Sequence, residues 1–261
     1  METTELLSLD SKVCLVTGGA GKYGVCIVEG LAEAGATVIT ASRNLDAGEN
    51  FANSMRERGL DVHARAVDQA DHDTVVRLKA SIVEDFGGLD VFVNNAVARP
   101  VSGGWDGFTV DALSESMRVN AVGMIDITRE MAELIARRGG GTIVNIASMM
   151  GMFGPDLSNY DGTDMGTPAP DYFFHRAGMI NFTRYLAHVL ADKKIRANCI
   201  SPGGLRSPGQ PDRFVENYTK KVMVGRLADH DDIKGVVVFL ASEASRYITG
   251  ENILMDGGMH C

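Results

Sequence analysis

The feature that most constrains the fold of this chain is a glycine-rich turn between a strand pattern and a helix pattern. An apolar run at 12–17 stops abruptly at 18–24, Gly-Gly-Ala-Gly-Lys-Tyr-Gly, and a helical pattern continues from 25 to 34. Glycine backbone can turn tightly and bring N–H groups and a helix N-terminus close to a phosphate. The order strand, glycine turn, helix therefore predicts a cradle for the pyrophosphate of a dinucleotide.

The pattern that follows the turn supports this interpretation. Gly18, Gly21 and Gly24 follow G-x-x-G-x-x-G rather than G-x-G-x-x-G, and among 30 glycines an ordinary turn is the alternative. Downstream, strand patterns alternate with helix patterns, the strands at 36–41, 61–67 and 89–93 and the helices at 45–58 and 71–86. The alternation predicts an α/β fold, a doubly wound parallel sheet that carries helices on both faces and ligands at its carboxyl edge.

We predict one domain over 1–261, because no Pro/Ser/Gly-rich linker interrupts the alternation. Its cofactor-binding half spans about 10–150, and its catalytic and substrate half about 140–261. The net charge of −9 and the dispersed basic residues argue against a nucleic-acid surface. An acidic N-terminus and the lack of any stretch of ~20 apolar residues predict neither a secretory signal nor a membrane span.

The cysteines and histidines indicate neither disulfides nor a metal. Cys14, Cys26 and Cys199 lie inside apolar patterns and are predicted to be core thiols in a reducing cytoplasm. Cys261 ends the chain, and with His260 it could lie near a neighbouring subunit's pocket or in a disordered tail. The six histidines do not cluster, so no metal site is predicted.

Residues capable of chemistry occur in the second half. The apolar strand pattern at 141–147 delivers Ser148 at its carboxyl end. Tyr172 and Arg176, four apart, share one face of a long predicted helix. A cation beside a phenol lowers its pKa from ~10 toward neutrality, as general acid/base work requires, although such a pair is also a common surface contact.

Together these motifs resemble the short-chain dehydrogenase/reductase family over nearly the whole chain. The resemblance implies a single doubly wound Rossmann-type domain with a seven-stranded, mostly parallel sheet and helices on both faces. The matching segments are the turn at 17–24, Asn94-Asn95-Ala96, Asn120 in Arg-Val-Asn-Ala-Val-Gly, Ser148, Tyr172 with Arg176, Pro202-Gly203, and the run from 239 to 258. The resemblance implies that Tyr172 exchanges a proton with the substrate oxygen, Ser148 hydrogen-bonds that oxygen, and Asn120 holds a relay water. Hydride would pass between the substrate carbon and a nicotinamide.

The resemblance also implies the cofactor contacts. Asp68, which closes the third strand pattern, matches the family's adenine-contacting Asp, with an ordinary polar strand end as the alternative. The segment 207–222 matches the family's mobile substrate lid. The predicted cofactor-binding residues are Gly18, Gly21, Lys22, Tyr23, Gly24, Ser42, Arg43, Asp68, Gln69, Asn95, Ala96, Tyr172, Arg176, Pro202, Gly203, Leu205 and Ser207.

Two departures from the family pattern concern the catalytic group and the cofactor bed. Arg176 stands where the family has Lys; it keeps the positive charge, but a guanidinium does not release its proton and cannot relay one. We expect Tyr172 to stay activated and turnover to be slower than in an Arg176→Lys variant. Val97 replaces the family's Gly after Asn94-Asn95-Ala96 and crowds the cofactor bed.

A third departure is the long segment between Ser148 and Tyr172. Tyr160 lies nearer the family's usual spacing, but Gly162 breaks the helix that its motif requires, so Tyr172 is preferred. The segment is similar to that of sugar-related members and predicts a pocket for a hydroxyl-rich substrate, although turn formation explains the same residues. The predicted substrate contacts are Ser148, Met150, Tyr160, Thr163 and Tyr172.

The end of the second strand pattern bears on the cofactor. It carries no carboxylate for a ribose 2′-hydroxyl, whereas Ser42 and Arg43 suit a 2′-phosphate and Lys22 adds a cation. We predict NADP, with NAD as second choice. The alternative for Arg43 is a surface side chain that stacks on adenine or faces solvent.

The helix patterns at 172–190 and 111–135 are apolar on more than one face, which predicts a homodimer or homotetramer. The leading hypothesis is a cytoplasmic oxidoreductase that interconverts a secondary alcohol and a carbonyl on a polar, sugar-derived small molecule. The alternatives are a cofactor-binding protein with lost catalysis, and an isomerase or dehydratase that retains its cofactor.

Overall fold

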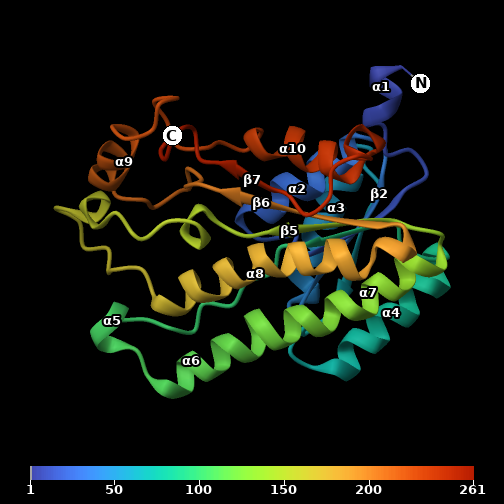
Figure 1. Ribbon diagram of the computed structural model, residues 1–261, viewed down its shortest axis with the longest axis horizontal. Helices are drawn as coiled ribbons and strands as arrows, with labels where there is room; N and C mark the ends of the chain where they lie inside the picture. Colours follow the sequence, from blue (N-terminus) through green and yellow to red (C-terminus); the bar gives the residue numbers. More distant parts are fainter. Residues whose placement is uncertain (1) are drawn as a thin grey trace.

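A computed structural model describes residues 2–261 and shows one seven-stranded sheet in the order β3-β2-β1-β4-β5-β6-β7 (Figure 1). Every pairing is parallel, so the sheet is wholly rather than mostly parallel. The order in which successive strands are added to the sheet reverses at β1, which pairs with β2 on one side and β4 on the other. The strands are β1 Val13–Thr17, β2 Thr37–Ser42, β3 Val62–Ala66, β4 Val91–Asn94, β5 Gly141–Ile146, β6 Ile195–Pro202 and β7 Asn252–Met255.

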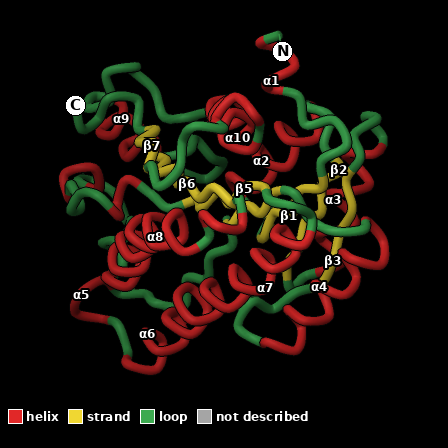
Figure 2. Tube along the Cα trace, turned by 45° about the vertical axis from the view of Figure 1, so that its right-hand side comes forward, coloured by secondary structure: helices red, strands yellow, loops and turns green. Residues whose placement is uncertain are grey.

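Helices cover both faces of the sheet, α2, α3 and α10 on one and α4, α7 and α8 on the other (Figures 1 and 2). The helices are α1 Thr3–Leu7, α2 Lys22–Glu33, α3 Leu45–Arg56, α4 His72–Phe86, α5 Gly104–Gly107, α6 Val110–Met117, α7 Met124–Arg137, α8 Pro170–Val189, α9 Asp212–Thr219 and α10 Asp232–Ala241. In the part of the chain described, no helix is long and apolar enough to cross a bilayer.

Two apolar cores form because successive strand residues point to opposite faces. In β1, Cys14 and Val16 pack with α2 and α10, whereas Val13 and Leu15 pack with α4 and α7. All of β1 is buried, as expected for a strand covered on both sides. The sheet is thereby held rigidly between two layers, and its carboxyl edge provides a fixed platform for side chains.

The helix predicted at 111–135 is interrupted in the structure. α6 ends at Met117, a π-helical segment spans Arg118–Gly123, and α7 begins at Met124. Such π-helical turns occur frequently at functional sites because the extra residue redirects side chains. The segment carries Asn120, which is buried.

Candidate active site

The glycine turn between β1 and α2 is held in place from two sides. Gly18 has a φ of 66°, in the left-handed region that favours glycine, and a Cβ on Gly24 would lie 2.2 Å from the Gly18 carbonyl oxygen. The Asn95 amide donates to the carbonyls of Thr17 at 2.9 Å and Gly18 at 3.1 Å. From the other side, the Tyr23 hydroxyl donates to the Gly203 carbonyl at 3.1 Å.

A cavity of about 790 Å³ runs along the carboxyl edge of the sheet, from the glycine turn to Tyr172. The structure brings most of the predicted site residues together here: Gly18, Gly21, Lys22, Tyr23, Gly24, Ser42, Arg43, Asp68, Gln69, Asn95, Ala96, Ser148, Met150, Tyr160, Tyr172, Arg176, Pro202, Gly203 and Leu205. Asn120, Thr163 and Ser207 do not line it. The volume is that of a site for a dinucleotide and a small substrate.

The end of the cavity beside β2 is basic. Arg43 is exposed, and within residues 2–261 its side chain makes no hydrogen bond or ion pair. The Ser42 hydroxyl donates to the Asn44 carbonyl at 3.2 Å, so it is engaged in a local turn. Asp68 also lines this end of the cavity, and its Oδ1 accepts from the Ala70 N–H at 3.0 Å.

Tyr172 occupies the opposite end, in the first turn of α8, and its ring lies close to two guanidinium groups. The Arg176 Cζ is 5.1 Å from the ring centroid and the Arg99 Cζ is 4.4 Å away. Burial alone raises the pKa of Tyr172, but the positive charges of Arg176 and then Arg99 outweigh burial and lower that pKa. The phenolate needed by a general base is therefore favoured.

Arg176 is 3% exposed, and it is fixed through one end of its guanidinium. Nη1 donates to the Ile146 carbonyl at 2.6 Å, whereas buried Nε has no partner within residues 2–261. The Ser148 hydroxyl accepts from the Met150 N–H at 3.2 Å, so its own hydrogen remains available to donate. Both residues line the cavity.

Asn120 acts on the loop that follows β4. Its Oδ1 accepts from the Ala98 N–H at 2.8 Å, and its Nδ2 donates to the Ala98 carbonyl at 2.8 Å and to the Ser116 hydroxyl at 3.0 Å. Ser116 in turn donates to Asp171, the residue before Tyr172. The amide thus ties the residue before Arg99 to the start of α8.

The segment between Ser148 and Tyr172 contacts the segment predicted as a lid. Asn159 and Tyr160 reach the cavity, where Phe214 and Tyr218 of α9 meet them. The Asn217 amide donates to the Asp161 carbonyl at 2.9 Å, and Lys221 pairs with Asp156 at 2.5 Å. The two segments therefore form one cover over the substrate end.

Thr163 and Ser207, two residues predicted to contact a ligand, take part in local hydrogen bonds instead. Thr163 Oγ1 donates to the Tyr160 carbonyl at 2.8 Å and accepts from the Met165 N–H at 3.2 Å. The Ser207 N–H donates to the Gln210 side chain at 2.9 Å, and Gln210 rather than Ser207 lines the cavity.

Sequence reasoning missed Arg99, Asn159 and Phe214, which all line the substrate end. For Arg99 a signal existed, because it follows β4 at the edge where a doubly wound sheet binds ligands. Asn159 and Phe214 lie in irregular or covering segments, where no periodicity indicates which side chains point inward.

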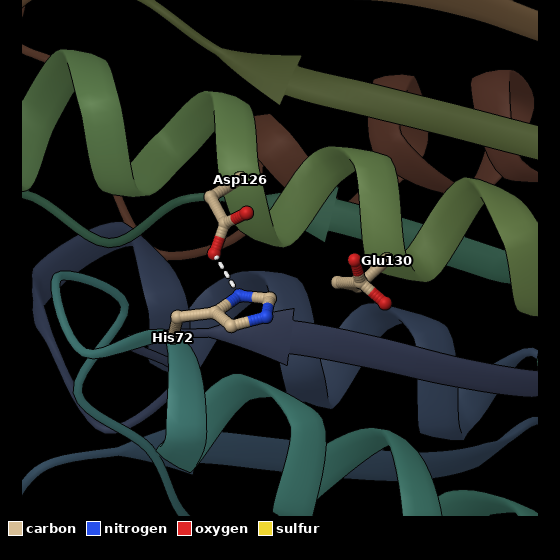
Figure 3. Close-up of side chains that lie close together, drawn as sticks. All are labelled: His72, Asp126 and Glu130. Carbon is tan, nitrogen blue, oxygen red and sulfur yellow. Dashed lines mark hydrogen bonds and ion pairs between the residues drawn. The ribbon is translucent and has the colours of Figure 1, made fainter.

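His72, Asp126 and Glu130 lie close enough together to suggest a cation site (Figure 3). His72 Nδ1 is 2.8 Å from Asp126, as the dashed line shows. However, Arg129 pairs with Asp126 at 2.8 Å, and Lys79 pairs with Glu130 at 2.8 Å. Because both carboxylates are already neutralised by cations, we assign no metal to this group.

A second cavity, of about 620 Å³, lies away from the motif residues at the amino end of the strands. Lys12, Arg138 and Arg196 contribute to its lining. Arg196 donates to the Leu240 and Ser242 carbonyls at 3.2 and 3.1 Å, so its charge serves packing between β6 and α10. The chemistry of the molecule therefore lies at the carboxyl edge.

A glycine cradle at one end of a cavity and an activated tyrosine beside a serine at the other define a dinucleotide-dependent oxidoreductase. Residues 23–260 match the family profile described as Enoyl-(Acyl carrier protein) reductase. The chain is 30% identical to the 3-oxoacyl-(acyl-carrier-protein) reductase of Thermotoga maritima, over 97% of this chain and 99% of that protein. It is 34% identical to the NADP-dependent mannitol dehydrogenase of Hypocrea jecorina, over 97% and 94%.

Among solved structures, the fold is similar to a gluconate 5-dehydrogenase from Burkholderia cenocepacia in complex with NADP and tartrate. The TM-score is 0.86 at 26% identity, covering 99% of this chain and 98% of the other. The chain belongs to the short-chain dehydrogenase/reductase family and is an NAD(P)-dependent oxidoreductase.

Proposed function

We propose that the protein is an NADP(H)-dependent oxidoreductase that interconverts a secondary alcohol and a carbonyl on a polar, hydroxyl-rich small molecule. The observation that carries this proposal is the lowered pKa of Tyr172 beside Ser148, at the end of the cavity opposite the glycine cradle. A binding-only protein needs neither an activated phenol nor a donor next to it.

The residues of the chain fit a dinucleotide. A side chain on Gly24 would collide with the Gly18 carbonyl oxygen, so only glycine fits in the turn that would hold the pyrophosphate. At the nicotinamide end, the buried Nε of Arg176 is a donor without a partner within residues 2–261. Bound there, the cofactor supplies the hydride acceptor or donor. In oxidation, the Tyr172 phenolate takes the proton of the substrate hydroxyl while Ser148 donates to the same oxygen and orients it.

Arg176 performs two of the three tasks of the family's lysine. Its charge lowers the pKa of Tyr172, and its free donors can bind the nicotinamide ribose. It does not relay a proton, because a guanidinium stays protonated at any working pH. An Arg176→Lys variant should therefore turn over faster in at least one direction, and equal or slower turnover in both directions would contradict the relay reasoning.

We propose NADP(H) as the preferred cofactor. Arg43 is exposed at the end of β2, has no partner within residues 2–261, and stands where a 2′-phosphate would lie. The mannitol dehydrogenase relative is NADP-dependent by name, and the similar gluconate 5-dehydrogenase holds NADP. Titration of the protein's binding to NADPH and NADH tests the preference, and tighter NADH binding would overturn it.

We propose a hydroxyl-rich substrate because Asn159, Tyr160 and Ser148 place polar groups around the reacting end of the cavity. Cofactor absorbance followed against sugars, sugar acids and polyols tests the activity. Tyr172→Phe is the control, because it removes the acid/base and keeps the ring. Tight cofactor binding with no absorbance change on any substrate would favour the cofactor-binding alternative; substrate conversion without net cofactor change would favour an isomerase or dehydratase.

We further propose a homo-oligomer in the cytoplasm. Along α8, Phe174, Tyr185 and Val189 are 72%, 60% and 43% exposed and recur at helical spacing on one face, which suits contact with a second copy. Light scattering tests this, and Phe174→Asp should shift the mass toward the monomer while Tyr247→Asp, at a fully exposed position outside that face, should not. A reducing compartment suits Cys14, Cys26 and Cys199, which are buried free thiols.

A further inference from the structure

The substrate end of the cavity holds a positive charge for which the protein supplies no counter-charge. Arg99 is exposed, lines the cavity with Ser148 and Tyr160, and within residues 2–261 makes no ion pair or hydrogen bond. Its guanidinium rests instead over the Tyr172 ring, 4.4 Å from the centroid. In a chain of net charge −9, an arginine facing a cavity without a carboxylate partner is a site for an anion.

The lining of the cavity strengthens this interpretation. Its acidic lining residue is Asp68, which lies at the adenosine end, close to the Ala70 backbone to which it is hydrogen-bonded. The cavity lining that includes Arg99 also includes Met150, the hydroxyl and amide groups of Ser148 and Asn159, and the cation Arg176. The charge of Arg99 also acts on Tyr160 and His175. Within residues 2–261, no carboxylate that would repel a negatively charged substrate lines this end of the cavity.

The backbone that leads into Arg99 is held in place by hydrogen bonds with Asn120. Asn120 holds both the N–H and the carbonyl of Ala98, the preceding residue, at 2.8 Å each. Through Ser116 the same amide is connected to Asp171 at the start of α8. The loop bearing the cation and the helix bearing the acid/base are therefore positioned together, as a site that binds one part of a substrate and reacts with another requires.

We infer that Arg99 binds the carboxylate of the substrate, and that the enzyme acts on a hydroxy acid and the corresponding keto acid. The planar fork of a guanidinium matches a carboxylate with two parallel hydrogen bonds. A phosphate dianion fits less well, because the neighbouring guanidinium, Arg176, is buried and its Nη1 is bound to the Ile146 carbonyl. This inference rests on the proposed function and narrows its substrate class.

The test compares D-gluconate with D-glucitol, a matched acid and neutral polyol, as substrates with NADP+. The readout is the ratio of kcat/KM for the acid to kcat/KM for the polyol, because any effect of Arg99 on the pKa of Tyr172 is common to both substrates and cancels. A charge-assisted hydrogen-bonded pair is worth about 1.5–3 kcal/mol, so Arg99→Gln should lower the ratio about 10- to 100-fold. Arg99→Lys, which keeps the charge without the fork, should give an intermediate ratio.

The matched control is Arg43→Gln, the same substitution at the other end of the cavity, which should leave the ratio unchanged. An unchanged ratio in Arg99→Gln overturns the inference while leaving the proposed oxidoreductase function intact. If no substrate is oxidised, the proposed function fails, and calorimetric titration of the NADP+-saturated protein with tartrate decides the inference. Binding that weakens about 10-fold or more in Arg99→Gln supports a carboxylate site; binding that is absent, or equal in both proteins, refutes it.

Discussion

The ionisation of Tyr172 should depend on Arg176 more strongly than on Arg99, although Arg99 is nearer. At an effective dielectric constant of about 20, a unit charge at the 5.1 Å separation of Arg176 from the ring interacts with a phenolate by about 3 kcal/mol. Arg176 is 3% exposed, so this value applies. Arg99 lies at 4.4 Å but is exposed, and a dielectric constant near 80 leaves about 1 kcal/mol. Burial therefore makes the charge of Arg176 the stronger of the two, although the Arg99 Cζ lies nearer to the ring centroid.

The prediction is that Arg176→Gln raises the pKa of Tyr172 about three times as far as Arg99→Gln does. Arg176→Lys is the matched control, because it keeps the charge and should change the pKa little. The assay is an NMR titration of protein with 13Cζ-labelled tyrosine, and Tyr172→Phe assigns the signal. Burial raises the pKa of Tyr160, Tyr218 and Tyr23, so these cavity tyrosines should ionise after Tyr172.

The same change should appear in catalysis. In the proposed mechanism the Tyr172 phenolate is the base in alcohol oxidation, so we expect the oxidation rate to rise as the pH passes upward through the pKa of Tyr172. A variant with a higher pKa shifts this limb to higher pH. If Arg99→Gln moves the titration as far as Arg176→Gln, or if neither moves it, burial and charge do not activate Tyr172 in the way described.

Three further predictions concern cofactor binding and stability. Arg43→Ala should weaken NADPH binding about 10- to 100-fold, the value of a charge-assisted contact, and leave NADH binding within about twofold by fluorescence titration. Gly24→Ala should abolish binding of either cofactor in the same titration, because its Cβ would lie 2.2 Å from the Gly18 carbonyl oxygen. Burial opposes ionisation of Glu29, but its hydrogen bonds with Arg58, His230 and Lys234 outweigh burial and lower its pKa from 4.5 to about 2. The ionised Glu29 therefore stabilises the folded state fully above pH ~4.5, and this stabilisation is lost as the pH falls toward 2. That contribution is about 3 kcal/mol at most, and Glu29→Gln should remove it in urea unfolding at pH 7 but have little effect near pH 2.

The parts of the fold and site that could be predicted from the sequence are those set by local pattern. The strands lie within about two residues of the predicted ranges, because a strand that is buried on both faces of the sheet requires a continuous run of apolar residues. The glycine turn was predictable because Gly18 and Gly24 are needed for a positive φ and a close backbone contact. Tyr172 and Arg176 fall on one helix face by spacing alone, and the structure places both at the cavity.

The remaining features depend on contacts between segments far apart in the chain. A single apolar helix was expected at 111–135, and the π-helical turn at 118–123 arises where Asn120 reaches across to Ala98. Thr163 is typical of a polar pocket in the sequence, but its hydroxyl closes a turn on Tyr160. The spacing of residues in a sequence does not indicate which hydroxyl group will donate to a backbone carbonyl.

Arg176 and Arg99 together account for the replacement of the family's lysine. A lysine at that position combines charge, ribose binding and proton relay in one group. Here the buried charge and the ribose donor remain with Arg176, and a second, solvent-exposed charge comes from Arg99 on a loop that Asn120 holds in place. Relay alone is lost, since neither guanidinium releases a proton. In the proposed mechanism, the proton taken up by Tyr172 would therefore leave through the open side of the cavity, the side on which we propose that Arg99 binds the substrate. Under this proposal, substrate binding and proton release would share one opening, the one beside the contact between α9 and the segment before Tyr172.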